Sequence, residues 1–451
     1  MKSIFCGIGL GAVLASTQLA SAGPKISDMK EYPDPTGTAQ SFSANGALDT
    51  RNLFFQSLGS NGRSCITCHQ PDQGWTVTPA KIQQRFDATG GMDPIFRSND
   101  GSVSPLADVS TLDARRKAFS MLLTKGLIRV GIGIPANAEF ELAAVDDPYG
   151  YASSNELSLF RRPLPATNLR FLTTVMWDGR ESAAGAALQA DLIQQALDAT
   201  QGHAQSAGVL TSDQLNEIVN FEMGLTTSQS SDNNAGKLDT QGAQGGPIRL
   251  HHENFFTGIN DPLGGNPSGA LYNPGAMTLF DAWANPAPNK PQDAARAAVA
   301  RGEQLFNSKT FTVTGVAGLN DNLNLPAIPA TCTLCHDAPN VGNHSVGLPL
   351  NIGLADASRR TPDMPLYTLR NKTTGELQQT TDPGRALISG RWRDIGKMKG
   401  PILRGLAARA PYFHNGSAAT LSDVVDFYDT RFNIGFTPQE KSDLIAFLQS
   451  L

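Results

Sequence analysis

The sequence predicts a mainly α-helical protein built from two related domains with long loops and insertions. Three observations lead to this fold class. A motif of two cysteines followed by a histidine occurs twice, each copy follows a similar Leu-Phe phrase, and two amphipathic helical patterns end the chain. The 451 residues suffice for two or three domains with ample cores. The 44 glycines and 28 prolines indicate long irregular segments between the helices.

The two motifs are Cys65-Ile66-Thr67-Cys68-His69 and Cys332-Thr333-Leu334-Cys335-His336. Two thiols at this spacing can form thioether bonds along one edge of a haem, and the next His then ligates the iron. A redox C-x-x-C pair or a zinc site is the alternative, but neither explains a His after both pairs. We therefore expect two covalently bound c-type haems. The expected attachment residues are Cys65, Cys68, Cys332 and Cys335, and the expected iron ligands are His69 and His336.

The N-terminus has the features of a secretory signal peptide over residues 1–22. An apolar run follows Lys2, and Ala20-Ser21-Ala22 matches a cleavage site. Cys6 lies in that run, so the mature chain would keep only the four motif cysteines. Because haems of this type are attached outside the inner membrane, we expect a periplasmic protein. No later stretch has the length of a membrane span, and the formal charge of −5 argues against a nucleic-acid role.

Proline punctuation divides the chain between the two motifs. Residues 284–292 form the predicted linker between an N-terminal haem domain, 23–283, and a C-terminal haem domain, 293–451. A helix is predicted over Ala294–Asn307, and its Leu-Phe ending resembles Arg51–Phe55 before the first motif, a weak internal repeat.

Two further segments interrupt this pattern. Residues 70–175 form a long insertion, which could build a lid or a pocket. The Gly-, Ser-, Asn- and Gln-rich stretch Thr226–Gly246 is predicted to be a surface loop.

The C-terminal segment contains the clearest helices. Thr437 and Glu440 form a capping box around a first-turn proline, and an apolar face follows. Thr420 and Asp423 start another helix in the same way. Tyr428 lies on the apolar face of that helix, which the i, i+3, i+4, i+7 spacing defines. The apolar residues of the two faces are Leu421, Val424, Val425, Leu444, Phe447, Leu448 and Leu451.

The combined motifs resemble the bacterial dihaem cytochrome c peroxidase and MauG family. The resemblance rests on both C-x-x-C-H motifs, Trp177-Asp178-Gly179-Arg180, the phrase Gly400–Arg404, and Pro411–Gly416. It implies a periplasmic peroxidase that reduces hydrogen peroxide, with high-valent iron shared between the two haems.

The resemblance also implies roles for individual residues. His69 would be the proximal ligand of the peroxidatic haem, and His336 that of the electron-transfer haem. Trp177 would carry charge between the haems, and Arg180 would bind a haem propionate. The alternative for Trp177 is an ordinary core residue.

The sixth ligand of the second haem distinguishes subgroups of this family. Most members have a Met fourteen residues after the His of Y-F-H-x-G, but this chain has Tyr428 at that distance from His414. This is similar to MauG. A phenolate favours higher oxidation states and lowers the reduction potential. The alternatives are that Tyr428 is a core residue or that Met398 is the ligand.

On the first haem, the resemblance concerns the distal side. Many members block this side with a His sixteen residues past the motif, where this chain has Arg85. The family uses a Gln and a later Glu for proton transfer. Gln195 resembles the Gln, and His203 is the titratable residue nearest the expected Glu. The alternative for His203 is a loop or propionate-binding residue.

The resemblance leaves a calcium ion between the domains open. Arg409 and Pro411 occupy the positions whose carbonyl groups would bind it, whereas the family's Asn ligand aligns with Arg162. Three other histidines are expected to be simple hydrogen-bonding residues. They are His251, His252 and His344.

Expected partners are hydrogen peroxide and a small redox protein or an oxidisable protein substrate, with a homodimer as the family's common assembly. The alternative functions are MauG-like oxidation of a partner protein, non-enzymatic dihaem electron transfer, and oxygenation of an organic substrate.

Overall fold

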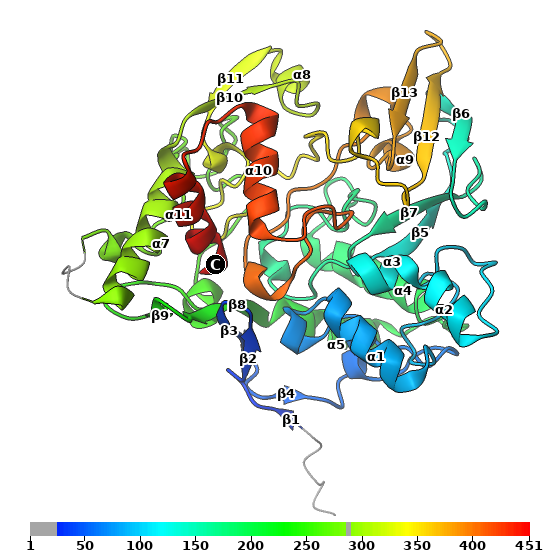
Figure 1. The fold of residues 1–451 in the computed structure, drawn as a ribbon, viewed down its shortest axis with the longest axis horizontal. Helices are drawn as coiled ribbons and strands as arrows, with labels where there is room; N and C mark the ends of the chain where they lie inside the picture. Colours follow the sequence, from blue (N-terminus) through cyan, green and yellow to red (C-terminus); the bar gives the residue numbers. More distant parts are fainter. Residues whose placement is uncertain (1–24, 286–289) are drawn as a thin grey trace, which may run out of the picture.

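The computed structural model describes residues 25–285 and 290–451, coloured along the chain in Figure 1. The predicted signal peptide, 1–22, lies outside the described residues, as does the centre of the predicted linker, 286–289. Helices form the larger part of the regular structure, in agreement with a mainly α class. The α-helices are α1 (Pro79–Thr89), α2 (Leu112–Ala118), α3 (Ser120–Lys125), α4 (Leu188–Gly202), α5 (Ser212–Met223), α6 (Pro247–His251), α7 (Pro291–Ser308), α8 (Asn320–Leu323), α9 (Ala386–Ser389), α10 (Leu421–Phe432) and α11 (Pro438–Gln449).

Small antiparallel sheets, which the sequence did not predict, join the helices. A four-stranded sheet has the order β2-β3-β8-β9, and a three-stranded sheet has the order β13-β12-β6. The two-stranded pairs are β1 with β4, β5 with β7, and β10 with β11. The strands are β1 (Lys25–Ile26), β2 (Glu31–Asp34), β3 (Gly37–Ser43), β4 (Leu48–Asp49), β5 (Ile128–Ile132), β6 (Phe140–Asp146), β7 (Leu157–Arg161), β8 (Leu225–Asp232), β9 (Gly236–Lys237), β10 (Phe311–Thr314), β11 (Ala327–Ala330), β12 (Leu366–Asn371) and β13 (Leu377–Thr380).

The two C-terminal helices begin where the sequence predicts. The hydroxyls of Thr420 and Thr437 accept hydrogen bonds from the backbone N–H groups of Asp423 and Glu440, which closes both capping boxes. Helix α11 packs against α7, which contains the predicted helix Ala294–Asn307. At their crossing, a Cβ on Gly302 would lie 2.1 Å from the Asp443 carbonyl oxygen, so only glycine allows this approach.

The predicted surface loop Thr226–Gly246 is wrong in its first part. Strand β8 lies in the interior of the four-stranded sheet, and its residues from Leu225 to Gln229 are buried. Its Thr227 hydroxyl pairs with hydroxyls of neighbouring segments, with Oγ1 lying 2.7 Å from Ser41 Oγ of β3 and 2.9 Å from Thr167 Oγ1. Polar composition therefore hid a buried strand, because a buried hydroxyl costs little once it is hydrogen-bonded.

The two Leu-Phe phrases differ in backbone structure. Leu53–Phe55 is a single 3₁₀ turn, capped by the Asn52 side chain, whereas the corresponding phrase before the second motif ends the long helix α7. Both phrases nevertheless place a phenylalanine ring against the motif histidine, with centroid distances of 6.3 Å for Phe54 and His69 and 6.0 Å for Phe306 and His336.

The insertion packs against the C-terminal half of the chain. Strand β6 pairs with β12 over Phe140–Asp146, although more than 200 residues separate the two strands. The buried Tyr367 hydroxyl of β12 also donates to the Ser158 carbonyl of β7, at 2.7 Å. Figure 1 shows β6 and β12 side by side at the upper right, with β7 below them. Within residues 25–285 and 290–451, no helix has the length and apolarity needed to cross a membrane.

Candidate haem sites

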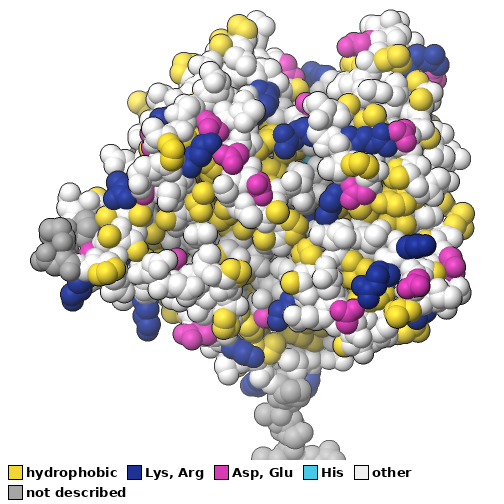
Figure 2. Space-filling model, viewed as in Figure 1, with side chains coloured by type: hydrophobic (Ala, Val, Ile, Leu, Met, Phe, Trp, Pro, Cys, Tyr) yellow, Lys and Arg dark blue, Asp and Glu magenta, His cyan; other side chains and the backbone are white. Residues whose placement is uncertain are grey.

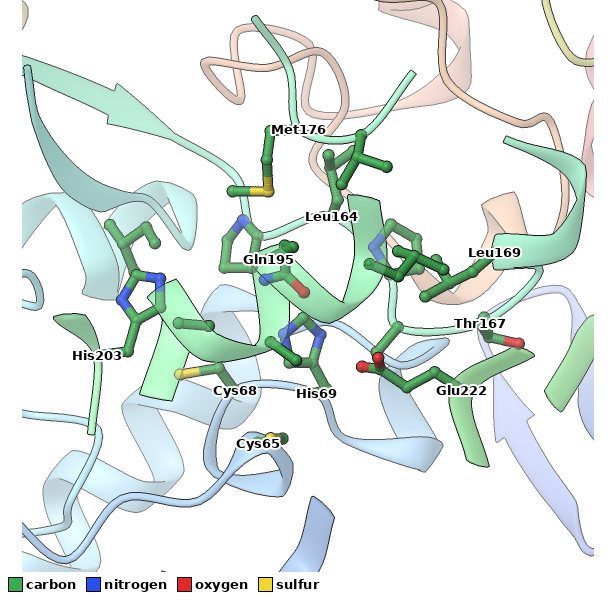
Figure 3. Close-up of a pocket in the computed structure, with 18 of the residues that line it drawn as sticks. Cys65, Cys68, His69, Leu164, Thr167, Leu169, Met176, Gln195, His203 and Glu222 are labelled. Carbon is green, nitrogen blue, oxygen red and sulfur yellow. The ribbon is translucent and has the colours of Figure 1, made fainter. Parts of the chain in front are cut away.

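The first C-x-x-C-H motif lines a deep cavity (Figure 3). Cys65–Thr67 forms a 3₁₀ turn with a Ser64–Thr67 capping box, which brings Cys65, Cys68 and His69 to one side of the cavity. His69 Nδ1 lies 3.0 Å from the Trp75 carbonyl oxygen, so this nitrogen carries the proton and Nε2 is left as a donor to a metal. Burial lowers the pKa of His69 to about 4, which keeps the ring neutral, as ligation requires.

The second motif repeats this geometry in a second cavity. His336 Nδ1 lies 3.2 Å from the Gly342 carbonyl oxygen, which is again six residues further along the chain. Burial lowers the pKa of His336 to about 4. Burial also raises the pKa of both thiols of this motif, Cys332 and Cys335, to about 12. All four cysteines are free thiols, so neither pair forms the disulfide that a redox motif would allow.

Zinc ligand sets are not found in the described part of the chain, where no three His, Cys, Asp or Glu side chains gather to hold a metal ion. The two cavities are instead lined mainly by apolar side chains around their motifs, as the face of a porphyrin requires.

Buried cations on the cavity walls suit the propionates of a haem. Arg162, Arg409 and Lys399 line the first cavity, and none of them pairs with a carboxylate in the described ranges. Burial lowers the pKa of Lys399 to about 7, and its ammonium donates only to the Thr174 carbonyl, at 3.1 Å. The two guanidinium groups bind backbone carbonyls, which leaves Lys399 as the buried cation of this group best placed to receive an anion. The residues present therefore fit two c-type haems.

Two histidines of the second cavity support the same fit. His414 is 1% exposed, and neither of its ring nitrogens has a hydrogen-bond partner. His344 bonds through Nδ1 to the Cys335 carbonyl at 2.9 Å, but its Nε2 is also buried without a partner. Buried polar atoms normally have partners. His414 Nε2 lies 4.0 Å from an Asp382 carboxylate oxygen, so of these nitrogens His344 Nε2 is the one that a group in the second cavity would complete. His344 thus makes the hydrogen bond expected from the sequence, although the side chain is buried.

Trp177 lies in the wall that separates the two cavities, because it lines both of them. Its indole N–H donates to the Arg162 carbonyl at 2.8 Å. Its ring meets the His414 ring edge to face, with centroids 6.2 Å apart. Lys399 and Pro401 share this wall. The indole is therefore held in one orientation between the two predicted haems.

The predicted proton-transfer residues both line the first cavity. Gln195 lies within helix α4, and His203 is the C-cap residue of that helix. The adjacent Gln194 is exposed and bonds to Asp198 instead. Figure 3 shows His203 at the side of the cavity near Cys68, with Met176 and Leu164 across from the motif cysteines.

His203 has a partner that the sequence analysis missed. Its Nδ1 bonds to the carboxylate of Asp100, which in turn forms an ion pair with the buried Arg63. Although burial raises the pKa of Asp100, its bonds to His203 and Arg63 lower it overall. The carboxylate thus orients the ring and leaves Nε2 for the cavity. No signal in the sequence linked Asp100 to His203, because 103 residues separate them.

Glu222 is a second residue that the sequence analysis missed. It lines the first cavity, is 6% exposed, and leaves Oε2 without a hydrogen-bond partner. Burial raises the pKa of Glu222 to about 8, so the carboxyl group is protonated at neutral pH. The signal was present in the sequence: Leu215, Ile218 and Val219 define the buried face of α5, and position 222 continues it at i+7.

Tyr428 and Met398, the two candidate sixth ligands, both line the second cavity. Burial raises the pKa of the Tyr428 phenol, and the nearby thiols of Cys335 and Cys332 raise it further. The phenol therefore lies beside the second motif. Met398 reaches the cavity from a segment that pairs with Leu350. The geometry brings both residues to the site and leaves Tyr428 ligation a prediction.

Two arginines have defined partners. Arg180 lines the first cavity and bonds to both carboxylate oxygens of Asp178 at 3.2 Å, so its role as a propionate ligand stays a prediction. Arg85 donates to the Thr67 carbonyl at 2.7 Å and pairs with Asp93 at 2.5 Å. The position at which many relatives carry a blocking His is therefore an ion-paired arginine.

Comparison with known proteins gives partial similarity. No family model matches the sequence. Cytochrome-c peroxidase IdrP2 of Denitromonas iodatirespirans is 32% identical over 130 residues, which are 27% of this chain and 35% of that protein. Cytochrome c peroxidase Ccp of Escherichia coli is 38% identical over 89 residues, 19% of each chain. The matches to these curated relatives thus span about a third of their length or less.

Two solved structures are similar over most of their length at low identity. A crystal structure of a MauG-like protein associated with microbial copper homeostasis has a TM-score of 0.41 and 18% identity, covering 89% of this chain and 86% of the other. A variant of the dihaem peroxidase BthA from Burkholderia thailandensis has a TM-score of 0.32 and 16% identity, covering 89% and 84%.

Proposed function

We propose that this protein is a c-type dihaem peroxidase that reduces hydrogen peroxide with electrons from an external donor. One observation carries the proposal. Two cavities, each lined by a C-x-x-C-H motif, share a wall that contains Trp177, and the first of them is also lined by the His203–Asp100 pair. This arrangement has a place for peroxide, a proton shuttle and a route for electrons. The partial similarity to cytochrome c peroxidases agrees with it.

Side chains of the protein would hold the haems, transfer the proton, orient the peroxide and conduct charge. The haems, once attached, supply the redox chemistry, with His69 and His336 as their proximal ligands. Reduction of one peroxide to two waters consumes two protons and two electrons. His203 Nε2 is the group that takes a proton from the bound peroxide and returns it to the leaving oxygen, while Asp100 holds the imidazole in place. Gln195 orients the peroxide, and Trp177 conducts charge through the shared wall.

The setting of the reaction follows from the same proposal. The predicted signal peptide and the attachment chemistry place the enzyme in the periplasm. The electron donor is then a small redox protein of that compartment. A homodimer remains the expected assembly on family resemblance.

A second candidate is oxidation of a partner protein, as in MauG. The presence of Tyr428 in the second cavity, beside Cys332 and Cys335, favours it. An anionic ligand would stabilise a more oxidised second haem, which could withdraw electrons from a protein side chain. Mass spectrometry of the partner separates the two functions, since a simple electron donor gains no covalent change.

The test is stopped-flow visible and near-infrared spectroscopy of the fully oxidised protein mixed with stoichiometric peroxide. An immediate change with a near-infrared charge-resonance band would support peroxide chemistry shared between two haems. A response only after one haem is reduced would support a peroxidase that needs activation, and would count against Tyr428 ligation. No response in either state would leave an electron carrier and reject the proposal.

A further inference from the structure

The side chain of Arg162 connects two halves of the molecule through backbone carbonyl groups. Its Nη2 donates to the Arg409 carbonyl at 3.0 Å, and its Nη1 lies 3.2 Å from the Lys125 carbonyl and 3.4 Å from that of Gly126. Its backbone N–H donates to the His414 carbonyl at 2.6 Å. A guanidinium that binds several carbonyl oxygens in this way has the contacts of a bound metal cation.

The two positions that would supply calcium ligands are therefore already bound to each other. The family resemblance places a side-chain ligand at Arg162 and a carbonyl ligand at Arg409. In this chain the side chain at position 162 is itself a cation, and its guanidinium donates to the Arg409 carbonyl. Calcium requires six to eight oxygen ligands, and the Arg162 side chain supplies none while its guanidinium already binds the Arg409 carbonyl oxygen.

Electrostatics disfavours a calcium ion at the same carbonyl. The ion would have to share the Arg409 carbonyl oxygen with the Arg162 guanidinium, a cation 3.0 Å from that oxygen. The two guanidinium groups already repel each other, since burial and then the charge of Arg409 lower the pKa of Arg162 to about 9. A divalent cation would add to this repulsion. The donor set thus does not fit calcium.

We propose that the Arg162 guanidinium takes the place of an interdomain calcium ion and makes this protein independent of calcium. The consequence reaches the wall between the cavities, because the Arg162 carbonyl is the acceptor for the Trp177 indole N–H. Arg162 is therefore a positioning residue. It hydrogen-bonds the carbonyl groups of Lys125, Arg409 and His414, and its own carbonyl orients Trp177. The inference does not rest on peroxidase activity.

The first test is metal analysis of the haem-loaded protein, purified with calcium and then passed through gel filtration. We expect no calcium above background, and a melting temperature that changes by less than about 1 °C with calcium or with the chelator EGTA. One calcium per chain, released by EGTA with a lower melting temperature, would overturn the proposal. This measurement requires no variant.

The second test is Arg162→Asn, which restores the side chain that the family resemblance places at the calcium site. We expect the melting temperature to fall by about 3–5 °C and to be recovered by calcium but not by magnesium. Arg431→Gln is the matched control, because Arg431 also donates to three carbonyl groups, those of Ile352, Thr314 and Gly315, but lies away from Trp177. The control should not respond to calcium.

A third variant covers the case in which Asn at this position does not fold. Arg162→Lys keeps the charge but not the planar fork, and should lose part of the stability without gaining a calcium response. Variants at position 162 that melt like the unmodified protein would overturn the proposal, since the guanidinium would then hold nothing together.

Discussion

His203 and Asp100 form a hydrogen-bonded pair at the edge of the first cavity, with His203 Nδ1 on the Asp100 carboxylate. Arg63 forms an ion pair with the same carboxylate, and Asp100 is only 6% exposed, so the carboxylate is fixed in the core. The His203 side chain is 41% exposed, and its imidazole faces the cavity. A histidine held in one tautomer by a buried carboxylate is suited to proton transfer at its other nitrogen.

His203→Gln should therefore lower the rate of reaction with peroxide by about 10²–10⁴-fold, because a glutamine cannot accept the proton. Asp100→Asn should give a smaller loss, since it disturbs the tautomer but keeps the imidazole. Stopped-flow rates against peroxide concentration give both values. His252→Gln is the control, because His252 is exposed and lines neither cavity. Equal rates for His203→Gln and this control would remove His203 from the mechanism.

Trp177→Phe should separate the two haems. Peroxide would still react at the first site, but oxidation of the second haem would slow by about tenfold or more, because phenylalanine is much harder to oxidise than an indole. The time courses of the two haem absorption bands measure this directly. Trp392→Phe is the matched control, as Trp392 packs in a separate core around Phe140. If both variants passed charge at the parent rate, Trp177 would be only a structural residue.

The sequence predicted the elements whose signals are local. The two motifs and the capped helices after Thr420 and Thr437 depend on residues close together in the chain, and the structure agrees with each of these local patterns. The joining of Trp177 to both cavities was inferred from the family resemblance, and the structure places this residue in the shared wall.

The remainder depends on contacts between distant segments. Asp100 reaches His203 across 103 residues, and no sequence period links them. Strand β8 escaped notice because serine and threonine hydroxyls satisfy one another in its interior. The argument against a calcium site depends on Arg162, whose guanidinium donates to the carbonyl of a residue 247 positions further along the chain. In each case, hydrogen bonding in the folded state decides the role of a residue whose type alone is uninformative.

Tyr428 and Met398 can be distinguished by reduction potential. If Tyr428 ligates the second haem, Tyr428→Met should raise the potential of that haem by about 100 mV or more, since a thioether stabilises the reduced iron and a phenolate the oxidised iron. Met398→Leu should leave it nearly unchanged. Spectroelectrochemical titration gives the two potentials. A large shift in Met398→Leu with none in Tyr428→Met would assign the ligand to Met398.

Lys399 is a buried amine in the wall between the cavities, where burial lowers its pKa to about 7, and the loss of its partial positive charge at neutral pH should affect both haems. Lys399→Met should lower both reduction potentials by about 50–100 mV, because a nearby cation favours the more negative, reduced state. Lys397→Gln is the control: Lys397 is equally buried and two residues away, but it pairs with Asp394 at 3.0 Å and lines neither cavity. A shift in only one potential would place the ammonium at one haem instead of between two.

Glu222 should make stability depend on pH. Its pKa is about 8 in the folded protein, against an ordinary value of 4.5, because burial disfavours the carboxylate. Between these values the unfolded chain is ionised while the folded chain holds the proton, so raising the pH from 5 to 8 favours unfolding. Glu222→Gln removes this dependence of stability on pH, because a glutamine side chain does not titrate.

We therefore expect Glu222→Gln to melt about 2–4 °C above the parent at pH 8 and at the same temperature at pH 5, measured by calorimetry of the haem-loaded protein. Glu217→Gln on the exposed side of the same helix should show no such pH-dependent difference. A constant difference at both pH values would mean that Glu222 acts through packing, whereas a destabilised variant at pH 8 would show that the carboxylate is the form the folded site holds.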